Sequence, residues 1–319
     1  MPPSSALGPS GDMEPSGGPA VGLSPGRRCA RRERHRDGEQ HDRRWDGRDA
    51  DGSRDQDGGR EGRSNRGAYD GGVGSHPPLP LDGHEPEIAD PGDLRAHRKR
   101  RLVLAYRLFG ALHWGEQGDG HISARDAEHT DCFWLLRYGV PFGRATEDDL
   151  VLVGPDGRVV EGDGEINPTA YSIHGPIHEA RPDVVCATHT HTPYGTPWSA
   201  CAEPFSMICQ EALAFHERHS VFDDGEVDVQ GTDGGKRIAA ALGEGRLVIL
   251  RNHGLLTVGP NVDEAMGWYL MAERVAEVHC KAPRPKPISD DDARRCAVTI
   301  ADPATAWHAF NWSIRARAL

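Results

Sequence analysis

The segment VVCATHTHTPYG, residues 184–195, decides how the rest of this chain is interpreted. Its apolar half predicts a buried strand, and two histidines, His189 and His191, stand where that strand ends. Successive side chains of a strand point to opposite faces, so these two imidazoles share one face and can both reach one metal ion. For an isolated pair of this kind, two hydrogen-bonded polar groups at a strand end are the simpler explanation.

A third histidine favours the metal site. His253 lies in RLVILRNHGLLTVG, residues 246–259, where two apolar strands are joined at Asn-His-Gly. A buried imidazole at such a break needs a partner. Three histidines at strand ends form an open site with coordination positions left for substrate or water, and nitrogen ligands suit Zn²⁺ first, with Mn²⁺, Fe²⁺ or Co²⁺ as alternatives.

The apolar periodicity of the remaining chain predicts alternating helices and strands. Residues 150–163 form a hairpin pattern around a Pro-Asp-Gly turn, and Asn261 with Glu264 forms a capping box at the start of a long helix. Because several strands are joined by hairpins, we expect an α/β fold, a three-layer α/β/α sandwich around a central, largely antiparallel (mixed) sheet. The expected helices cover residues 93–114, 169–180, 207–218, 234–242 and 261–281, and short strands cover 121–125 and 132–136.

Composition divides the chain at about residue 90. Residues 1–90 are rich in Arg, Asp and Gly and contain no Lys, no Phe and no Ile before Ile88, so they predict a disordered tail. A start codon assigned too far upstream in a GC-rich gene explains the same composition. Residues 91–319 are the expected length of one globular domain.

Charge and cysteine usage narrow the class of protein. The net charge is −12, and acids interleave with the arginines of the tail, so nucleic-acid binding is not expected. The sequence has no apolar run long enough for a membrane span and no apolar signal region at its start, so no membrane partner is expected. The seven cysteines form no CxxC pair, which indicates reduced thiols in a cytoplasmic protein.

HGPIHEARPDVVCATHTHTPYGTPWSA, residues 174–200, followed by the Asn-His-Gly break, resembles the class II aldolase/adducin family, and in particular its fuculose-phosphate aldolases. The segments 121–125, 139–141 and 149–157 match as well, so the resemblance covers about residues 93–312. It implies an α/β/α sandwich on a largely antiparallel sheet and a homotetramer with active sites near subunit contacts. It also implies that His189, His191 and His253 bind a divalent metal, zinc in the sugar-phosphate aldolases.

The resemblance also implies a lyase-like enzyme acting on a small hydroxy-carbonyl or hydroxy-acid substrate. Such a metal stabilises the enediolate or enolate that forms when a bond beside a carbonyl breaks. Aldol cleavage is the first expectation, and epimerisation, dehydration and decarboxylation are the alternatives. A second hypothesis is a non-catalytic, adducin-like oligomeric scaffold. Adducins lack the metal histidines, and this chain keeps all three, which favours the enzyme.

The sequence departs from the sugar-phosphate aldolases at the group that moves protons. Their glutamate four residues before the histidine matching His174 is Ala170 here. Tyr194 is the first candidate to replace it, because it closely follows the metal histidines, and His121, His174, His178 and Glu211 are the others. Packing or a hydrogen bond explains each of these side chains equally well.

The phosphate loop of the relatives, Gly-Asn-x-Ser, is also altered, because its asparagine is His121. A carboxylated or aromatic hydroxy compound is therefore as open as a sugar phosphate. The residues expected to contact substrate are Gly139, Thr169 and Arg144, and Arg125 is a further candidate for holding an anion. Surface positions explain both arginines equally well.

Overall fold

The computed structural model describes residues 78–225 and 227–319, which belong to one compact unit, Val73–Leu319. The expected tail, residues 1–90, lies mostly outside the described residues. The helices and strands of the described part are α1 (Pro91–Ala111), β1 (Gly120–Arg125), β2 (Phe133–Leu136), β3 (Leu150–Val153), β4 (Val159–Glu161), α2 (Pro168–Ala180), β5 (Cys186–Thr190), α3 (Gly195–Ser199), β6 (His219–Phe222), α4 (Thr232–Leu242), β7 (Leu247–Leu250), β8 (Gly254–Gly259), α5 (Val262–Lys281), α6 (Asp290–Ile300) and α7 (Pro303–Ala316). Short 3-10 helices are η1 (Phe142–Arg144), η2 (Glu147–Asp149) and η3 (Glu211–Phe215).

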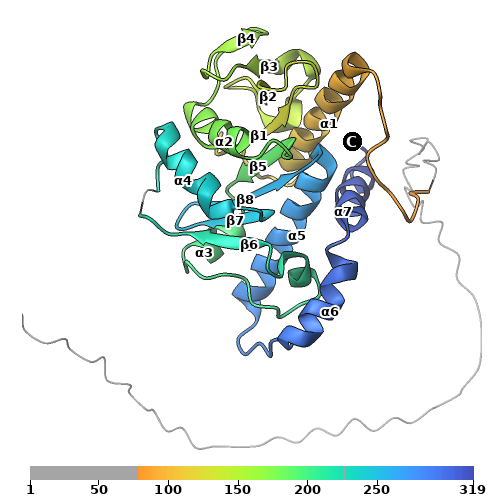
Figure 1. Cartoon of the computed structure of the whole chain (residues 1–319), viewed down its shortest axis with the longest axis vertical. Helices are drawn as coiled ribbons and strands as arrows, with labels where there is room; N and C mark the ends of the chain where they lie inside the picture. Colours follow the sequence, from red (N-terminus) through yellow and green to blue (C-terminus); the bar gives the residue numbers. More distant parts are fainter. Residues whose placement is uncertain (1–77, 226) are drawn as a thin grey trace, which may run out of the picture. The chain divides into compact units, whose positions relative to one another are not determined.

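The described strands form one eight-stranded sheet in the order β4-β3-β2-β1-β5-β8-β7-β6. Every neighbouring pair is antiparallel except β6 and β7, which are parallel. Helices α2 and α4 cover one face, and α1, α5 and α7 lie on the other (Figure 1). The expected three-layer α/β/α sandwich with a mixed, largely antiparallel sheet is therefore confirmed.

Three hydrophobic clusters lie between the layers of the described part, and the smallest joins β2 and β3 to Ala170 of α2. The largest one joins α1, α5 and α7 to the sheet, and its centre contains Tyr106, Phe109 and Tyr269, whose rings are fully buried. A smaller one joins α2 and α4 to the opposite face of β5, β7 and β8. Because a strand alternates its side chains between faces, the central strands supply apolar groups to clusters on both faces.

The middle of the sheet sets up the site. Strand β1 pairs with β5 so that His121 lies opposite His189, and β5 pairs with β8 so that His189 also lies opposite Leu256. Helix α5 begins after Asn261, whose side chain accepts a hydrogen bond from the Glu264 backbone N–H at 2.8 Å, as the capping box predicts. This helix packs along β5 and β8 and supports the strands that end in the histidines.

The expected helix over residues 207–218 is wrong. The structure forms only the short helix η3 there, and the Met207 carbonyl accepts a hydrogen bond from the backbone N–H of Ile288 at 2.7 Å instead of from its own turn. Residues 212–215 are all buried, because α5 and α6 cover this segment. An amphipathic helix buries only one face, so it does not suit a segment in which consecutive residues are all buried.

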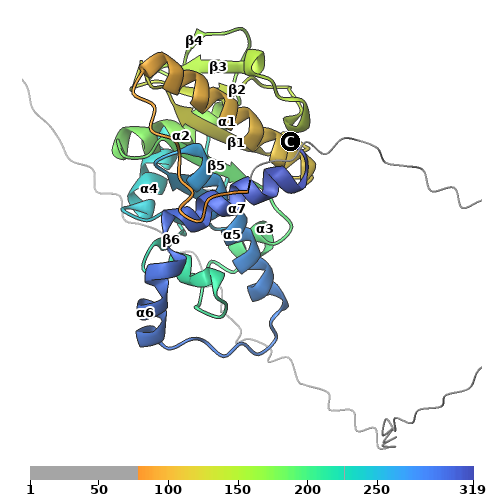
Figure 2. The ribbon, with the colours of Figure 1, turned by 90° about the vertical axis from the view of Figure 1, so that its right-hand side faces the viewer.

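Residues 78–90 lie along α7 (Figure 2). The His308 ring donates a hydrogen bond to the Pro80 carbonyl at 2.6 Å, and a Cβ added to Gly83 would lie 2.2 Å from the Trp307 ring. Asp90 then caps α1 by accepting a hydrogen bond from the Asp93 backbone N–H at 2.9 Å. The folded unit therefore includes this segment as well as the expected domain, residues 91–319.

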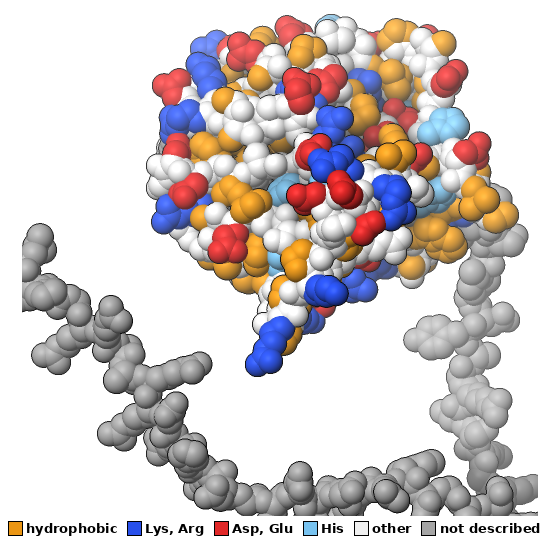
Figure 3. All heavy atoms as spheres, turned by 60° about the horizontal axis from the view of Figure 1, so that its bottom comes forward, with side chains coloured by type: hydrophobic (Ala, Val, Ile, Leu, Met, Phe, Trp, Pro, Cys, Tyr) orange, Lys and Arg blue, Asp and Glu red, His pale blue; other side chains and the backbone are white. Residues whose placement is uncertain are grey.

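Two further observations concern the outside of the described part. Its helices include none that is long and apolar enough to cross a membrane. The face shown in Figure 3 carries acidic and basic side chains side by side, interspersed with apolar ones.

Candidate metal centre and adjoining pocket

Three imidazoles meet at one end of the central strands. His189 is on β5, His191 follows the end of that strand, and His253 directly precedes β8. One ligand nitrogen from each lies within 4.8 Å of the others, and the ring centroids are 4.7–5.5 Å apart. This donor set fits a divalent ion of the borderline class, which prefers imidazole nitrogen.

The backbone around Asn-His-Gly explains how His253 reaches the other two rings. Asn252 adopts a left-handed conformation with φ of 57°, which asparagine tolerates better than most residues, and its N–H is bonded to the Ser199 carbonyl at 3.2 Å. A Cβ added to Gly254 would lie 3.4 Å from the His189 ring and 3.3 Å from the Thr190 carbonyl. The turn therefore brings His253 close to His189 without crowding it.

The protonation of His189 suits a metal ligand. Its Nδ1 lies 2.8 Å from the Leu255 carbonyl oxygen, which only accepts, so Nδ1 carries the proton and Nε2 keeps a lone pair. Burial lowers the pKa of His189 well below its usual range and lowers that of His253 to about 4, with the neighbouring imidazoles acting in the same direction. Both rings are therefore neutral at neutral pH, which is the ligand form.

The segment after His191 is held by a buried carboxylate on α5. Glu273 accepts hydrogen bonds from the Thr192 hydroxyl at 2.5 Å, the Tyr194 N–H at 2.9 Å and the Gly195 N–H at 2.7 Å. Burial raises the pKa of Glu273, and these three donors oppose that rise. The carboxylate thus ties the turn that carries His191 to the long helix behind it.

Asp119 is a residue that the sequence analysis did not identify. Its backbone carbonyl accepts the His191 N–H at 3.1 Å, and its carboxylate Oδ2 lies 3.6 Å from Nδ1 of the same ring. The other carboxylate oxygen is buried without a hydrogen-bond partner. Carboxylates in this position orient metal-binding histidines. The pairing of β1 with β5 places Asp119 here, and the sequence alone does not specify that pairing.

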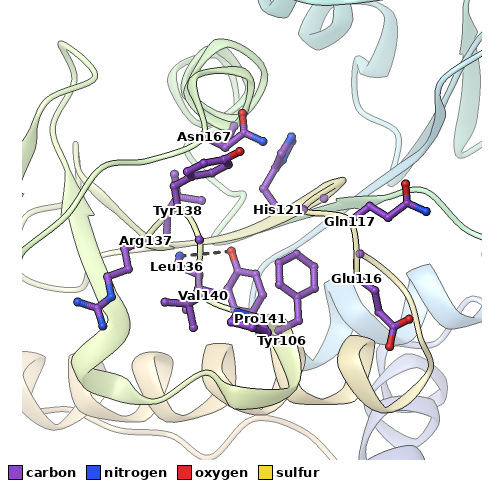
Figure 4. Close-up of a pocket in the computed structure, with 17 residues that line it drawn as sticks. Tyr106, Glu116, Gln117, His121, Leu136, Arg137, Tyr138, Val140, Pro141 and Asn167 are labelled. Atoms are coloured by element: carbon purple, nitrogen blue, oxygen red, sulfur yellow. Dashed lines mark hydrogen bonds between the residues drawn. The ribbon is translucent and has the colours of Figure 1, made fainter.

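His121 lies between the three histidines and a cavity of about 260 Å³. Its ring centroid is 5.0 Å from that of His189. His121 lies in the cavity wall (Figure 4), and Ala170 lines the same cavity. The remaining wall is largely apolar and aromatic, and its members include Tyr106, Leu135, Leu136, Val140, Pro141 and Phe142. Arg137, the lining arginine among the described residues, is already paired with Asp149 at 2.6 Å.

Behind His121, a row of hydrogen-bonded polar groups runs into the core. His121 Nδ1 lies 2.8 Å from His174 Nε2, and His174 Nδ1 lies 2.7 Å from the Ser123 hydroxyl. That hydroxyl lies 2.8 Å from His178 Nε2, and His178 Nδ1 lies 3.3 Å from the Val184 carbonyl. All four side chains are at most 5% exposed. We call this row the buried histidine chain.

The other expected site residues fall into two groups. Gly139 lines the cavity, and Thr169 lies at its edge, where its hydroxyl is bonded to the cavity residue Asn167 at 2.8 Å. Arg144 is exposed on η1 and does not line this cavity.

Tyr194 and Glu211 lie away from the cavity within one copy of the chain. The ring of Tyr194 packs against Lys281, whose ammonium lies 4.7 Å from the ring centroid, and Glu211 begins η3 beside α5 and α6. Arg125 donates hydrogen bonds to four backbone carbonyls, so it braces the loop before β5. Of the acid–base candidates, the structure brings His121, His174 and His178 together.

Fold and site together define a three-layer α/β protein with an open three-histidine site at the ends of its central strands. Residues 100–280, more than half of the chain, match the family described as Class II Aldolase and Adducin N-terminal domain. The chain belongs to the class II aldolase and adducin family.

Three relatives illustrate the range of this family. The chain is 36% identical over 221 residues to "Decarboxylase NovR" of Streptomyces niveus, covering 68% of this chain and 82% of the relative. It is 34% identical over 232 residues to "4-hydroxy-3-prenylphenylpyruvate oxygenase/4-hydroxy-3-prenylbenzoate synthase" of Streptomyces roseochromogenus subsp. oscitans, covering 71% and 84%. The solved structure of an L-fuculose 1-phosphate aldolase from Glaciozyma antarctica PI12 aligns with a TM-score of 0.68 at 30% identity, covering 74% of this chain and 94% of that chain.

Proposed function

We propose that this protein is a metal-dependent lyase that breaks a carbon–carbon bond beside a carbonyl group in a small hydroxy-carbonyl or hydroxy-acid substrate. The observation that carries the proposal is the group of three imidazoles with ligand nitrogens within 4.8 Å of one another. Zn²⁺ is the first candidate, and Mn²⁺, Fe²⁺ and Co²⁺ suit the same nitrogen donors. An ion held there supplies positive charge against the enediolate or enolate that develops on the substrate oxygens.

His121 is the group that we assign to proton transfer. It contacts His189, lines the cavity and is held neutral by burial, which lowers its pKa well below the usual range. A neutral imidazole with a free lone pair accepts the proton of a substrate hydroxyl and later returns it to the carbon that the broken bond leaves behind. This sequence of transfers is that of aldol cleavage, in which the proton moves from oxygen to carbon.

The cavity supports a substrate with an apolar or aromatic side group. Its wall offers aromatic rings and aliphatic side chains, and its arginine is already occupied by Asp149. The side-chain oxygen of Asn167 caps α2 by accepting hydrogen bonds from the N–H and the hydroxyl of Thr169. Its NH₂ group is therefore left to bind a ligand. Among the described residues that line this wall, no unpaired arginine or lysine is present to bind a phosphate group.

Decarboxylation of an aromatic oxo acid is the second candidate reaction. The apolar cavity favours it, and so do the printed names of the two Streptomyces relatives, a decarboxylase and an enzyme named for a prenylated phenylpyruvate. A non-catalytic scaffold remains the alternative of another class, because the family description includes adducin. In either case we propose a cytoplasmic homotetramer, on the strength of family membership.

The first experiment measures bound metal in purified full-length protein by elemental analysis. We expect one divalent ion per subunit in the wild type and its loss in His191→Ala. His113→Ala is the matched control, because that ring is 79% exposed and is not one of the three clustered histidines. Metal-free wild type, or equal content in the wild type and His191→Ala, would contradict the proposal.

A second experiment distinguishes the reactions. Protein reloaded separately with each of the four metals is incubated with L-fuculose 1-phosphate, 4-hydroxyphenylpyruvate and 4-hydroxy-3-prenylphenylpyruvate, with and without dioxygen. Carbon dioxide release from an arylpyruvate supports decarboxylation, and aldehyde release from the sugar phosphate supports aldol cleavage. Bound metal with no turnover of any of these compounds favours the scaffold.

A further inference from the structure

We propose that His174, Ser123 and His178 are positioning residues, which form a one-directional hydrogen-bond chain that keeps the proton of His121 on Nδ1 and leaves its Nε2 lone pair facing the cavity. The inference rests on the role proposed above for His121. Nothing in that role requires the three residues behind it, so the two ideas can fail separately.

The direction of the chain is set at its inner end. A carbonyl oxygen can only accept a hydrogen bond, so His178 Nδ1, 3.3 Å from the Val184 oxygen, must carry a proton. Neutral His178 then has a lone pair on Nε2, and the Ser123 hydroxyl, 2.8 Å away, must donate to it. The fixed acceptor therefore determines which way the serine hydroxyl points.

The two outer hydrogen bonds of the chain, between Ser123 and the cavity, run in the same direction. With its proton committed to His178, the Ser123 oxygen accepts from His174 Nδ1 at 2.7 Å. Neutral His174 then has its lone pair on Nε2, which accepts from His121 Nδ1 at 2.8 Å. Each link leaves one arrangement, and the last one leaves Nε2 of His121 without a proton.

The three rings of the chain are buried, and burial favours the neutral form of an imidazole. His121, His174 and His178 are at most 5% exposed. At the inner end of the chain, burial lowers the pKa of His178 to about 3. A neutral imidazole carries one proton, so each ring has one donor and one acceptor.

The outer end of the chain points to a purpose beyond stability. No hydrogen bond joins His121 Nε2 to another residue of the described ranges, and the ring lines the cavity and contacts His189. The proton of His189 is fixed separately by the Leu255 carbonyl, which leaves its own Nε2 free. Two adjacent rings are thus held in the same tautomer by two independent backbone acceptors.

The test is the tautomer of His121, measured on metal-free full-length protein with ¹⁵N-labelled histidine by long-range proton–nitrogen correlation at pH 7.5. The signals are assigned by their absence in His121→Gln. We expect the Nδ1–H tautomer to predominate in the wild type. A predominant Nε2–H tautomer or a protonated ring would overturn the inference, and this result requires no further variant to fold.

Variants then test the chain link by link. Ser123→Ala and His178→Leu remove the directing groups, so we expect the His121 signals to move toward the Nε2–H tautomer. His178→Gln keeps an acceptor for Ser123 and is expected to restore the wild-type pattern. Ser172→Ala is the matched control, because that serine is also buried but is not part of the chain. An unchanged His121 tautomer in folded Ser123→Ala and His178→Leu would contradict the positioning role.

Turnover separates this inference from the proposed function. In the assays above, Ser123→Ala should lower kcat by about 10–100-fold, the usual cost of removing a group that orients an active-site ligand, with KM little changed. If His121→Ala leaves turnover intact while the tautomer results hold, the assignment of His121 as the proton-transfer group fails and the positioning chain stands. If the tautomer results fail while His121→Ala is inactive, the reverse holds.

Discussion

Two side chains that distinguish this protein from the sugar-phosphate aldolases of its family line the same cavity. This chain carries His121 and Ala170 at the positions where the resemblance to the sugar-phosphate aldolases implies an asparagine and a glutamate. Both belong to the cavity wall. The proposed proton-transfer group, His121, therefore lies on strand β1, where its ring contacts the proposed metal ligand His189, whereas Ala170 lies on helix α2.

We expect His121→Ala to keep its metal and lose activity. The three proposed ligands remain while the proposed base is removed, so turnover should fall by about 10²–10⁴-fold at unchanged metal content. Steady-state kinetics with metal analysis of the same sample measures both. Tyr194→Phe is the comparison, because its ring lies against Lys281 within one copy of the chain. A larger loss in Tyr194→Phe than in His121→Ala would move the role to that hydroxyl, acting at the site of another copy.

Ala170→Glu tests the other position. The methyl group is 2% exposed and lies in the cavity wall with His121. A carboxylate there competes for the positions left for substrate and attracts a proton to His121, so activity on the native substrate should fall while metal binding persists. Kinetic assays of the variant decide the matter, and a gain in native activity would mean that the family's glutamate is still required.

At the scale of elements, the helix α5 and the turn after β5 act as one unit through Glu273. In Glu273→Gln an NH₂ group replaces one of the two oxygens that receive the three donors of that turn. Hydrogen bonds to a charged group contribute about 1.5–3 kcal/mol each, so we expect a lower free energy of unfolding and weaker metal binding through displaced His191.

Urea unfolding of metal-free protein and metal titration measure these two effects. Glu277→Gln is the matched control, since Glu277 lies one turn further along α5 and makes exposed ion pairs with Arg274 and Lys281. Equal stability of Glu273→Gln and the control would show that the turn does not depend on the buried carboxylate.

Local patterns were sufficient for most of the elements. The hairpin pattern around Pro-Asp-Gly defined β3 and β4, continuous apolar runs defined β7 and β8, and Asn261 defined the start of α5. These signals act within a few residues along the chain. The two C-terminal helices were not predicted, although Ser289 and Asp302 cap them in the ordinary way. Helix α6 buries only Ala293, so it lacks the apolar stripe on which the expectation for the other helices rested.

The site, like the fold, could be predicted from the sequence only in part. Two of its histidines, two residues apart at a strand end, are placed on one face by the period of a strand alone. The buried histidine chain depends on which strand pairs with which, because His121 reaches His174 only when β1 lies beside β5 and under α2. Local sequence patterns do not reveal the order of strands in a sheet, so these long-range contacts could not be predicted from them.

At the scale of the whole molecule, two deletions test where the folded unit begins. Deleting residues 1–77 removes a segment poor in core-forming side chains, so the melting temperature should remain nearly unchanged. Deleting residues 1–90 also removes the contact of Gly83 with Trp307, the Pro80–His308 hydrogen bond and the Asp90 cap, so it should lower the melting temperature by several degrees. Thermal unfolding of both deletions in parallel tests this, and equal melting temperatures would place the boundary at residue 90.

Buried neutral histidines also make the stability of the whole molecule depend on pH. Burial lowers the pKa of His178 to about 3, whereas the unfolded chain has the ordinary value of about 6.5. As the pH falls below about 6.5, His178 becomes protonated in the unfolded state but stays neutral in the folded state. The contribution of His178 to the free energy of unfolding, which is fully present above that pH, is therefore lost progressively toward pH 3. The loss from this one residue approaches about 1.4 kcal/mol per pH unit.

His178→Gln isolates that contribution. Glutamine does not titrate, so between about pH 6 and pH 4 the free energy of unfolding should fall less steeply in the variant than in the wild type, by about 1.4 kcal/mol per pH unit. Urea unfolding of metal-free protein at pH 7, 6, 5 and 4 gives both slopes, and titrating carboxylates cancel because both proteins share them. Ser172→Ala, which changes a buried side chain that does not titrate, should retain the wild-type slope. Parallel curves for the wild type and His178→Gln would mean that His178 becomes protonated inside the folded protein, and the neutral hydrogen-bond chain would then be lost at the same pH.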